Sequence, residues 1–183
     1  MKIDYVDLRK QWQSERVELL KVIDQVLSSG QYVGGSEIKK FEKQICKITN
    51  KNYCVALNSG TDALTLGLHV LGVKRGDEVI TAPNSFVATV AAIVHLGAKP
   101  VFVDVKSDQN IDINLIEAAI TKKTKVILPV HLTGRMCEMN RIVSLAKRYG
   151  LKVIEDAAQS IGSKYNGKSA GFYGDVSEIW NHP

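Results

Sequence analysis

The sequence has few cysteines and no long hydrophobic run. Its three cysteines, Cys46, Cys54 and Cys137, show no CxxC or ligand-like spacing, which argues against a disulfide framework and against a zinc site. No apolar run approaches the ~20 residues of a membrane span, and residues 1–5 do not begin a signal peptide. We therefore expect a cytoplasmic protein with no membrane segment.

The sequence also lacks a concentrated patch of positive charge. Lysine and arginine total 24 against 19 acidic residues, a formal net charge of +5. The lysines are scattered or lie on predicted helix faces, and no aromatic residues are interleaved with them. This pattern indicates a solvated surface and no nucleic-acid partner, and it suits small anionic ligands.

Residues 1–52 predict two helices that precede the first strand. The first covers 14–27, and the second starts at Ser36 and carries an apolar stripe. We interpret 1–52 as an N-terminal helical arm and 53–183 as the main domain. The 183 residues and the hydrophobic content of 45% suit one ordinary core.

From Tyr53 the sequence alternates short apolar runs with helical segments. The runs are rich in valine and isoleucine, which is typical of parallel strands covered on both faces. We therefore predict a three-layer α/β/α fold with a mostly parallel sheet. The predicted strands are 54–57, 78–81, 100–103, 125–130 and 152–156. The predicted helices are 61–71, 86–96, 112–120 and 140–149.

Asp156 ends the last predicted strand, and the functional interpretation depends on it. The carboxyl ends of parallel strands face the ligand crevice of an α/β protein, so this acid lies where chemistry is normally done. The small residues Ala157 and Ala158 follow it, and then Gln159. For a lone aspartate, capping the next turn is the more ordinary role, so the other turns at this edge decide between the two interpretations.

The turn after the first predicted strand has the composition of a phosphate site. In the sequence NSGTDA at 58–63, Gly60 permits a tight turn, and unpaired amides at the helix N-terminus point toward the ligand edge. A plain helix cap by Ser59 or Thr61 is the alternative. The GxGxxG fingerprint of dinucleotide sites is absent, which argues against NAD.

Two further turns add side chains to the same edge. Phe86 follows the second strand and could stack on a planar ring, although a core position is the more common role for a phenylalanine. His131 and Arg135 follow the fourth strand and are candidates for substrate binding, since Arg135 could pair with an anion. A satisfied loop histidine and a solvated arginine are the alternatives.

A phosphate-binding turn, an aromatic side chain and an acid at the same edge of the sheet suit a phosphorylated pyridine ring. Pyridoxal 5'-phosphate is such a ring. An acid that faces its nitrogen keeps that nitrogen protonated, so that carbanion charge can enter the ring. The sequence therefore predicts pyridoxal phosphate as the cofactor.

Four motifs in order resemble the DegT-type sugar aminotransferases, which belong to the fold type I group of pyridoxal-phosphate enzymes. They are NSGTDAL at 58–64, NSFVAT at 84–89, PVHLTG at 129–134 and EDAAQ at 155–159. The resemblance extends to Asp7-Leu8 and to GFYGD at 171–175, so it covers nearly the whole chain. It implies the large domain of the fold type I transferases.

The resemblance also implies roles for five residues. Gly60 and Thr61 would hold the cofactor phosphate, and Phe86 would stack on the ring. Asp156 would pair with the pyridine nitrogen, and Gln159 would support the ring. The implied reaction moves an amino group from an amino acid, usually glutamate, to a nucleotide-linked keto sugar, in a homodimer with shared sites.

The end of the sequence departs from the family pattern. The family's Schiff-base lysine would fall just after Pro183, its phosphate-binding serine falls on Trp180, and the following aromatic falls on Asn181. Lys164 and Lys168 lie in a predicted exposed hairpin and are discounted as substitutes. We therefore expect an incomplete large domain that is inactive alone. A non-catalytic relative that binds the cofactor or a nucleotide sugar is one alternative, and a Rossmann-type NAD enzyme is another.

Overall fold

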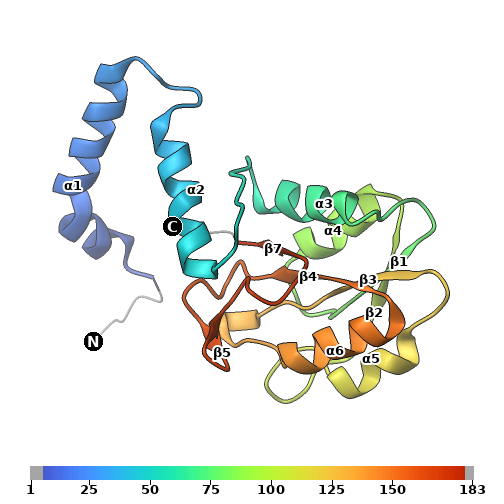
Figure 1. The fold of residues 1–183 in the computed structure, drawn as a ribbon. Coiled ribbons are helices and arrows are strands. Elements are labelled where there is room, and N and C mark those ends of the chain that lie inside the picture. The colour runs from blue at the N-terminus through green and yellow to red at the C-terminus, as the bar shows by residue number, and fades with distance from the viewer. Residues whose placement is uncertain (1–5, 180–183) are drawn as a thin grey trace. The chain divides into compact units, whose positions relative to one another are not determined.

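The computed structural model describes residues 6–179 (Figure 1). The chain forms two compact units, and the boundary between them lies inside helix α2 (Ser36–Thr49). One unit ends at Phe41 and the other begins at Glu42, whereas the sequence suggested a boundary after residue 52. The difference arises because Ile45 and Thr49, in the second half of α2, are buried. The sequence features noted at 1–5 and at 180–183 lie outside the described residues.

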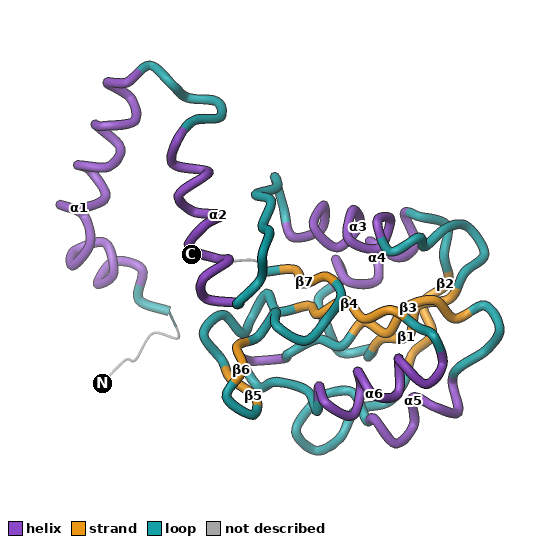
Figure 2. Tube along the Cα trace, in the orientation of Figure 1, coloured by secondary structure: helices purple, strands orange, loops and turns teal. Residues whose placement is uncertain are grey.

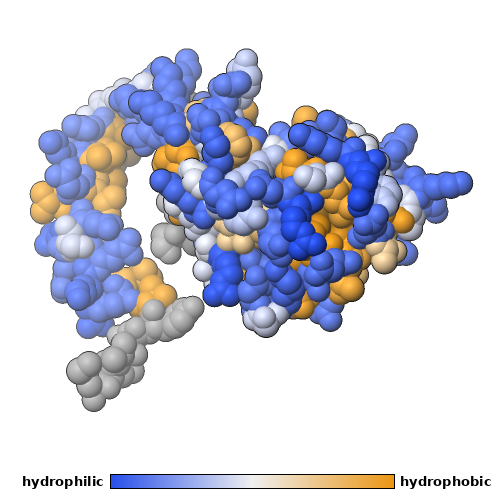
Figure 3. Space-filling model, turned by 60° about the horizontal axis from the view of Figure 1, so that its bottom comes forward, coloured by the Kyte–Doolittle hydropathy of each residue, from blue (hydrophilic) through white to orange (hydrophobic). Residues whose placement is uncertain are grey.

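The first unit is dominated by helix α1 (Leu8–Ser29), which is longer than the predicted 14–27. Its start is capped by Asp7, whose side chain accepts a hydrogen bond from the Lys10 amide at 2.9 Å. It ends at Gly30 in the left-handed conformation that favours glycine. None of its residues is buried, and Figure 3 shows hydrophobic surface among the hydrophilic residues of this helix.

The second unit is built on a five-stranded, entirely parallel sheet with the strand order β2-β1-β3-β4-β7 (Figure 2). The predicted fold class is therefore confirmed. The strands are β1 (Glu78–Thr81), β2 (Lys99–Phe102), β3 (Thr124–Leu128), β4 (Lys152–Asp156) and β7 (Val176–Glu178). The helices are α3 (Gly60–Val70), α4 (Val87–His95), α5 (Ile113–Ala119), the 3-10 turn η1 (Leu132–Gly134) and α6 (Met139–Tyr149).

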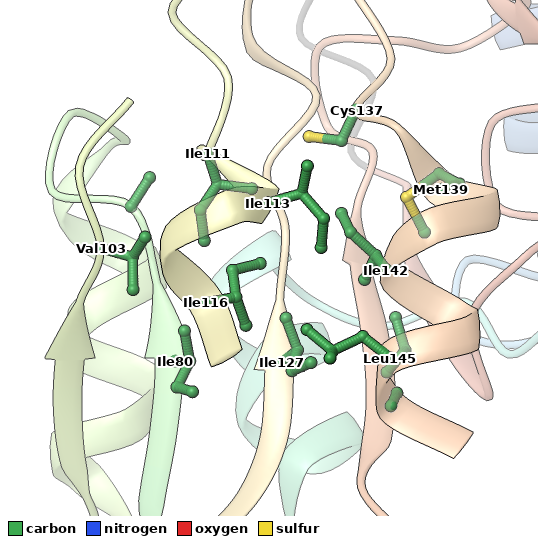
Figure 4. Close-up of a cluster of buried hydrophobic side chains, with 13 residues drawn as sticks. Ile80, Val103, Ile111, Ile113, Ile116, Ile127, Cys137, Met139, Ile142 and Leu145 are labelled. Carbon is green, nitrogen blue, oxygen red and sulfur yellow. The ribbon is translucent and has the colours of Figure 1, made fainter. Parts of the chain in front are cut away.

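Helices α5 and α6 cover one face of the sheet, and α3 and α4 cover the other (Figure 1). On the first face, Ile80 and Ile127 of the strands pack with Ile116 of α5 and Ile142 of α6 (Figure 4). On the second face, the neighbouring strand residues pack against α3 and α4; this cluster contains Leu64, Leu68, Val79, Ala92, Ile93, Val126, Leu128 and Ile154. Burial on both faces explains the non-alternating strand sequences.

Two features of the sheet differ from the sequence prediction. Residues 54–57 form no strand, and Val55 is 71% exposed, because no described strand lies in place to pair with this segment. Strand β7 was not predicted, since three residues are too few to show a hydrophobic pattern. The predicted hairpin does form, as β5 (Lys164–Tyr165) and β6 (Lys168–Ser169).

None of the described helices is long and apolar enough to cross a membrane.

The close contact of α3 with the sheet at Gly67 gives a first prediction. A Cβ atom there would lie 2.6 Å from Ile154 Cδ1 and 3.2 Å from Val176 Cγ1. We expect Gly67→Val to lower the free energy of unfolding by ~1–3 kcal/mol through overpacking, measured by urea denaturation. Leu66→Val, at an exposed site on the same helix, is the control for β-branching and should cost about 0.5 kcal/mol. Equal losses in the two variants would contradict the prediction.

Candidate functional site

A cavity of about 320 Å³ opens where β1, β4 and β7 end, which is within the usual size range of small-molecule sites. Each cofactor residue predicted from the sequence lines this cavity: Gly60, Thr61, Phe86, Asp156 and Gln159. The other lining residues are Ser59, Leu64, Ser85, Ala88, Thr89, Ala158 and Glu178. Segments far apart in the sequence are thus brought together by the parallel sheet.

The N-terminus of α3 forms part of the cavity lining. The Ser59 side chain caps this helix by accepting a hydrogen bond from the Asp62 amide at 3.1 Å. The amides of Gly60 and Thr61, in the first turn, have no partner within the helix. Together with the positive end of the helix dipole, these amides make an anion site suited to phosphate.

The cavity lining also contains Asp156, a residue that is only 5% exposed. The Thr89 hydroxyl donates to Asp156 Oδ2 at 2.9 Å, and the Ala158 amide donates to Oδ1 at 3.4 Å. Ser85 Oγ lies 3.0 Å from the same Thr89 hydroxyl, so a chain of hydroxyls leads to the acid. These bonds fix the carboxylate in one orientation.

Glu178 lies directly beside Asp156, because the two residues are register partners in the parallel pair β4 and β7. Glu178 is 3% exposed, and neither of its carboxyl oxygens has a hydrogen-bond partner among residues 6–179. Burial and the neighbouring Asp156 raise the pKa of Glu178 to about 9. Burial beside Asp156 therefore favours the protonated, neutral form of Glu178.

Phe86 and Gln159 also line the cavity. Phe86 stands at the start of α4 and is 69% exposed, so its side chain is available to a ligand. The Gln159 side-chain oxygen accepts a hydrogen bond from the Thr133 amide at 2.8 Å, which ties the loop after β4 to η1.

Neither His131 nor Arg135 is among the residues that line the cavity. His131 is fully buried; its Nδ1 accepts from the Cys137 amide at 3.3 Å, so Nε2 carries the proton and donates to Glu155 at 3.0 Å. With both ring nitrogens engaged, His131 supports the loop and has no free group for a substrate. Arg135 is exposed, and its side chain lies outside the cavity.

Glu155 connects three segments behind the site. Besides His131, its carboxylate accepts from the amides of Gly171 at 3.1 Å and Gly174 at 2.6 Å. Burial alone would raise the pKa of Glu155, but the hydrogen bonds from His131 and from these amides outweigh burial and hold the pKa below its usual range.

Sequence reasoning missed Thr89, Glu178 and Glu155. The four-residue spacing of Ser85 and Thr89 at the start of a helix was a usable signal, since it places both hydroxyls on one face. Glu155 was predicted only as part of the EDAAQ motif. Its position next to Asp156 in a strand was a usable signal, because it places Glu155 on the opposite face of the sheet. No sequence pattern indicated Glu178, because β7 itself was not recognised.

The parallel sheet, the helix N-terminus and the buried acid together define the large domain of the fold type I transferases, of which this chain contains part. The chain belongs to the DegT/DnrJ/EryC1/StrS aminotransferase family, whose model matches residues 13–180.

Individual relatives agree with this assignment. A pleiotropic regulatory protein of Geobacillus stearothermophilus is 45% identical over 97% of this chain and 48% of its own length. A UDP-2-acetamido-2-deoxy-3-oxo-D-glucuronate aminotransferase of Pseudomonas aeruginosa is 42% identical over 91% of this chain and 46% of its own length. The crystal structure of NtdA from Bacillus subtilis with bound cofactor PMP is 44% identical, with a TM-score of 0.81 over 86% of this chain and 37% of that one. The chain thus spans about half the length of the curated relatives it matches.

The Glu155 cluster gives a second prediction. Glu155→Gln places an amide group against amide donors, so we expect a loss of about 2–3 kcal/mol in the free energy of unfolding. Because the pKa of Glu155 is lowered in the folded protein, its contribution is present above pH about 4.5 and is lost as the pH falls. Urea denaturation at pH 7 and at steps down to about pH 3 measures both effects.

The matched control is Glu117→Gln. Glu117 pairs with Arg148 at 2.7 Å on the surface, with its side chain 49% exposed. We expect this substitution to change the free energy of unfolding by no more than about 0.5 kcal/mol. A Glu155→Gln variant as stable as this control would show that the buried cluster contributes nothing.

Proposed function

We propose that the protein binds pyridoxal phosphate and belongs to an enzyme that transfers an amino group from an amino acid, glutamate, to a nucleotide-linked keto sugar. The single observation that carries this proposal is the arrangement of one cavity. The amides of Gly60 and Thr61, in the first turn of α3, form an anion site in the cavity lining, and the buried acid Asp156 lines the same cavity.

The residues present fit the cofactor. The phosphate suits the α3 N-terminus, and a ring nitrogen that donates a hydrogen bond suits Asp156, whose carboxylate is oriented by the Thr89 hydroxyl. Phe86 would stack on one face of the ring, and Gln159 would support it from the loop after β4. When bound, pyridoxal phosphate supplies an electron sink for carbanion charge.

The substrate class rests on the relatives. The Pseudomonas aeruginosa relative is named as an aminotransferase of a UDP-linked 3-oxo sugar, which motivates a nucleotide-linked keto sugar here. We place the protein in nucleotide-sugar and polysaccharide biosynthesis. Arg135, exposed beside η1, is the residue we propose for contact with the sugar nucleotide.

We further propose a cytoplasmic homodimer. Helix α1 exposes Val17, Leu20, Ile23 and Leu27 at 45–75% of their surface, and an apolar helix face of this length favours a protein partner. Cys46, Cys54 and Cys137 are free thiols, which suits a reducing compartment.

Cofactor binding by this chain can be tested directly with pyridoxamine phosphate. None of the described cavity residues is a lysine, so the amine form, which needs no lysine, reports on the pocket alone. We expect saturable binding, and we expect Asp156→Asn to weaken it ten- to a hundredfold, because a charge-assisted hydrogen bond is worth ~1.5–3 kcal/mol. Asp24→Asn on the exposed surface of α1 is the control and should leave the affinity unchanged. Equal affinities in the two variants would remove Asp156 from the site.

A non-catalytic binding role is the second candidate, and the regulatory name of the Geobacillus stearothermophilus relative favours it. Sequencing the source DNA past the codon for Pro183 in all frames distinguishes the two candidates. For an aminotransferase we expect a lysine codon shortly after Pro183 and then a small domain. A stop codon there, with tight pyridoxamine phosphate binding, would instead support the binding role.

A further inference from the structure

The carboxyl groups of Asp156 and Glu178 are held next to each other by the backbone. Side chains of register partners in parallel strands point to the same face, and Asp156 pairs with Glu178 in β4 and β7. The Ala157 amide also donates to the Glu178 carbonyl at 2.9 Å, which fixes the strand ends. Both side chains line the cavity and are at least 95% buried.

The two carboxyl groups differ in their hydrogen bonds. Asp156 accepts from Thr89 and Ala158, whereas neither oxygen of Glu178 finds a donor in the part of the chain that the structure describes. Two adjacent buried carboxylates repel each other, and an unpartnered charge is costly to bury. A single proton held by the pair, on Glu178 and donated toward Asp156, removes both penalties.

Among residues 6–179, the other charged groups near β7 do not offer a counter-charge to Glu178. Lys51 donates to the Gly174 carbonyl at 2.7 Å, and Lys152 pairs with Asp175 at 3.0 Å. On β4, Glu155 faces the opposite side of the sheet and is bonded to His131. On α3, which packs over β7, Asp62 and His69 are exposed to solvent. Asp156 is the group that acts on the Glu178 carboxyl.

We propose that Glu178 and Asp156 form a carboxyl pair that shares one proton and sets the protonation of a pyridine nitrogen bound at Asp156. Glu178 is thus a positioning residue that acts through Asp156, and this role rests on the proposed cofactor. If a ring with an unprotonated nitrogen were bound, one proton would pass from the pair to that nitrogen. Asp156 would then accept from the ring N–H, and the positive ring nitrogen would offset the repulsion between the two carboxylates while the net charge stays unchanged.

The test follows the near-ultraviolet band of bound pyridoxamine phosphate, which changes when the ring nitrogen loses its proton. The band is titrated with pH in the parent chain and in Glu178→Gln, which keeps the shape of the neutral acid but cannot release a proton. We expect the bound ring of the variant to lose its proton at least one pH unit lower, a tenfold lower proton affinity. Glu117→Gln, on the surface, should match the parent.

The outcomes separate this proposal from the proposed function. Binding in both chains with equal titration midpoints would overturn the carboxyl pair and leave the cofactor assignment standing. Absence of binding in both chains would overturn the cofactor assignment, and the ring-nitrogen role with it.

The shared proton has a ligand-free test. Because the pKa of Glu178 is raised to about 9, the folded chain holds a proton that the unfolded chain releases above its ordinary pKa of 4.5. The parent should therefore lose stability as the pH rises from 5 to 9, seen as a falling urea midpoint. Glu178→Gln should show a smaller fall over the same range. Parallel profiles in the two chains would overturn the pair.

Discussion

Strand β4 sends two adjacent carboxylates to opposite faces of the sheet, and both sides of the site depend on this alternation. Glu155 points to one face and binds His131 and the amides of Gly171 and Gly174. Those amides lie in the segment that leads into β7, so this buried carboxylate holds β7 in register. The register in turn places Glu178 beside Asp156 on the other face. A residue with no access to the cavity therefore determines the composition of the cavity wall.

The anion end of the site depends on the same two strands. Helix α3 comes close to β4 and β7 because Gly67 has no side chain to separate it from Ile154 and Val176. The position of the helix axis fixes where its first turn stands, and hence where the amides of Gly60 and Thr61 point. The anion site and the acid of the cavity are thus linked through strand packing, although they are about a hundred residues apart in sequence.

The sequence allowed prediction of most of the sheet and of the five cavity residues, because these features leave local signals. Strands buried on both faces show as continuous valine and isoleucine runs, and turns at their carboxyl ends show as small and polar residues. Residues 54–57 had the same apolar signal but form no strand, because pairing depends on a neighbour that a local pattern cannot reveal. The proposal that His131 binds substrate also came from a local pattern. Only the fold shows that both of its ring nitrogens are hydrogen-bonded, one to Glu155 and the other to the Cys137 amide. The position of Glu178 beside Asp156 follows from the strand register, which depends on two segments and cannot be predicted from one of them alone.

The charged groups that line the cavity favour one orientation of a bound ligand. The α3 N-terminus contributes partial positive charge to the cavity lining, and the carboxyl pair, on different elements of the same lining, contributes negative charge. A buried, low-dielectric wall strengthens both fields, because little water is present to screen them. A flat ligand with an anionic group on one side and a cationic ring nitrogen on the other is favoured in one orientation and disfavoured when reversed. The proton on Glu178 limits the negative end to one charge while the cavity is empty, so the full field develops only when a cation is there to balance it.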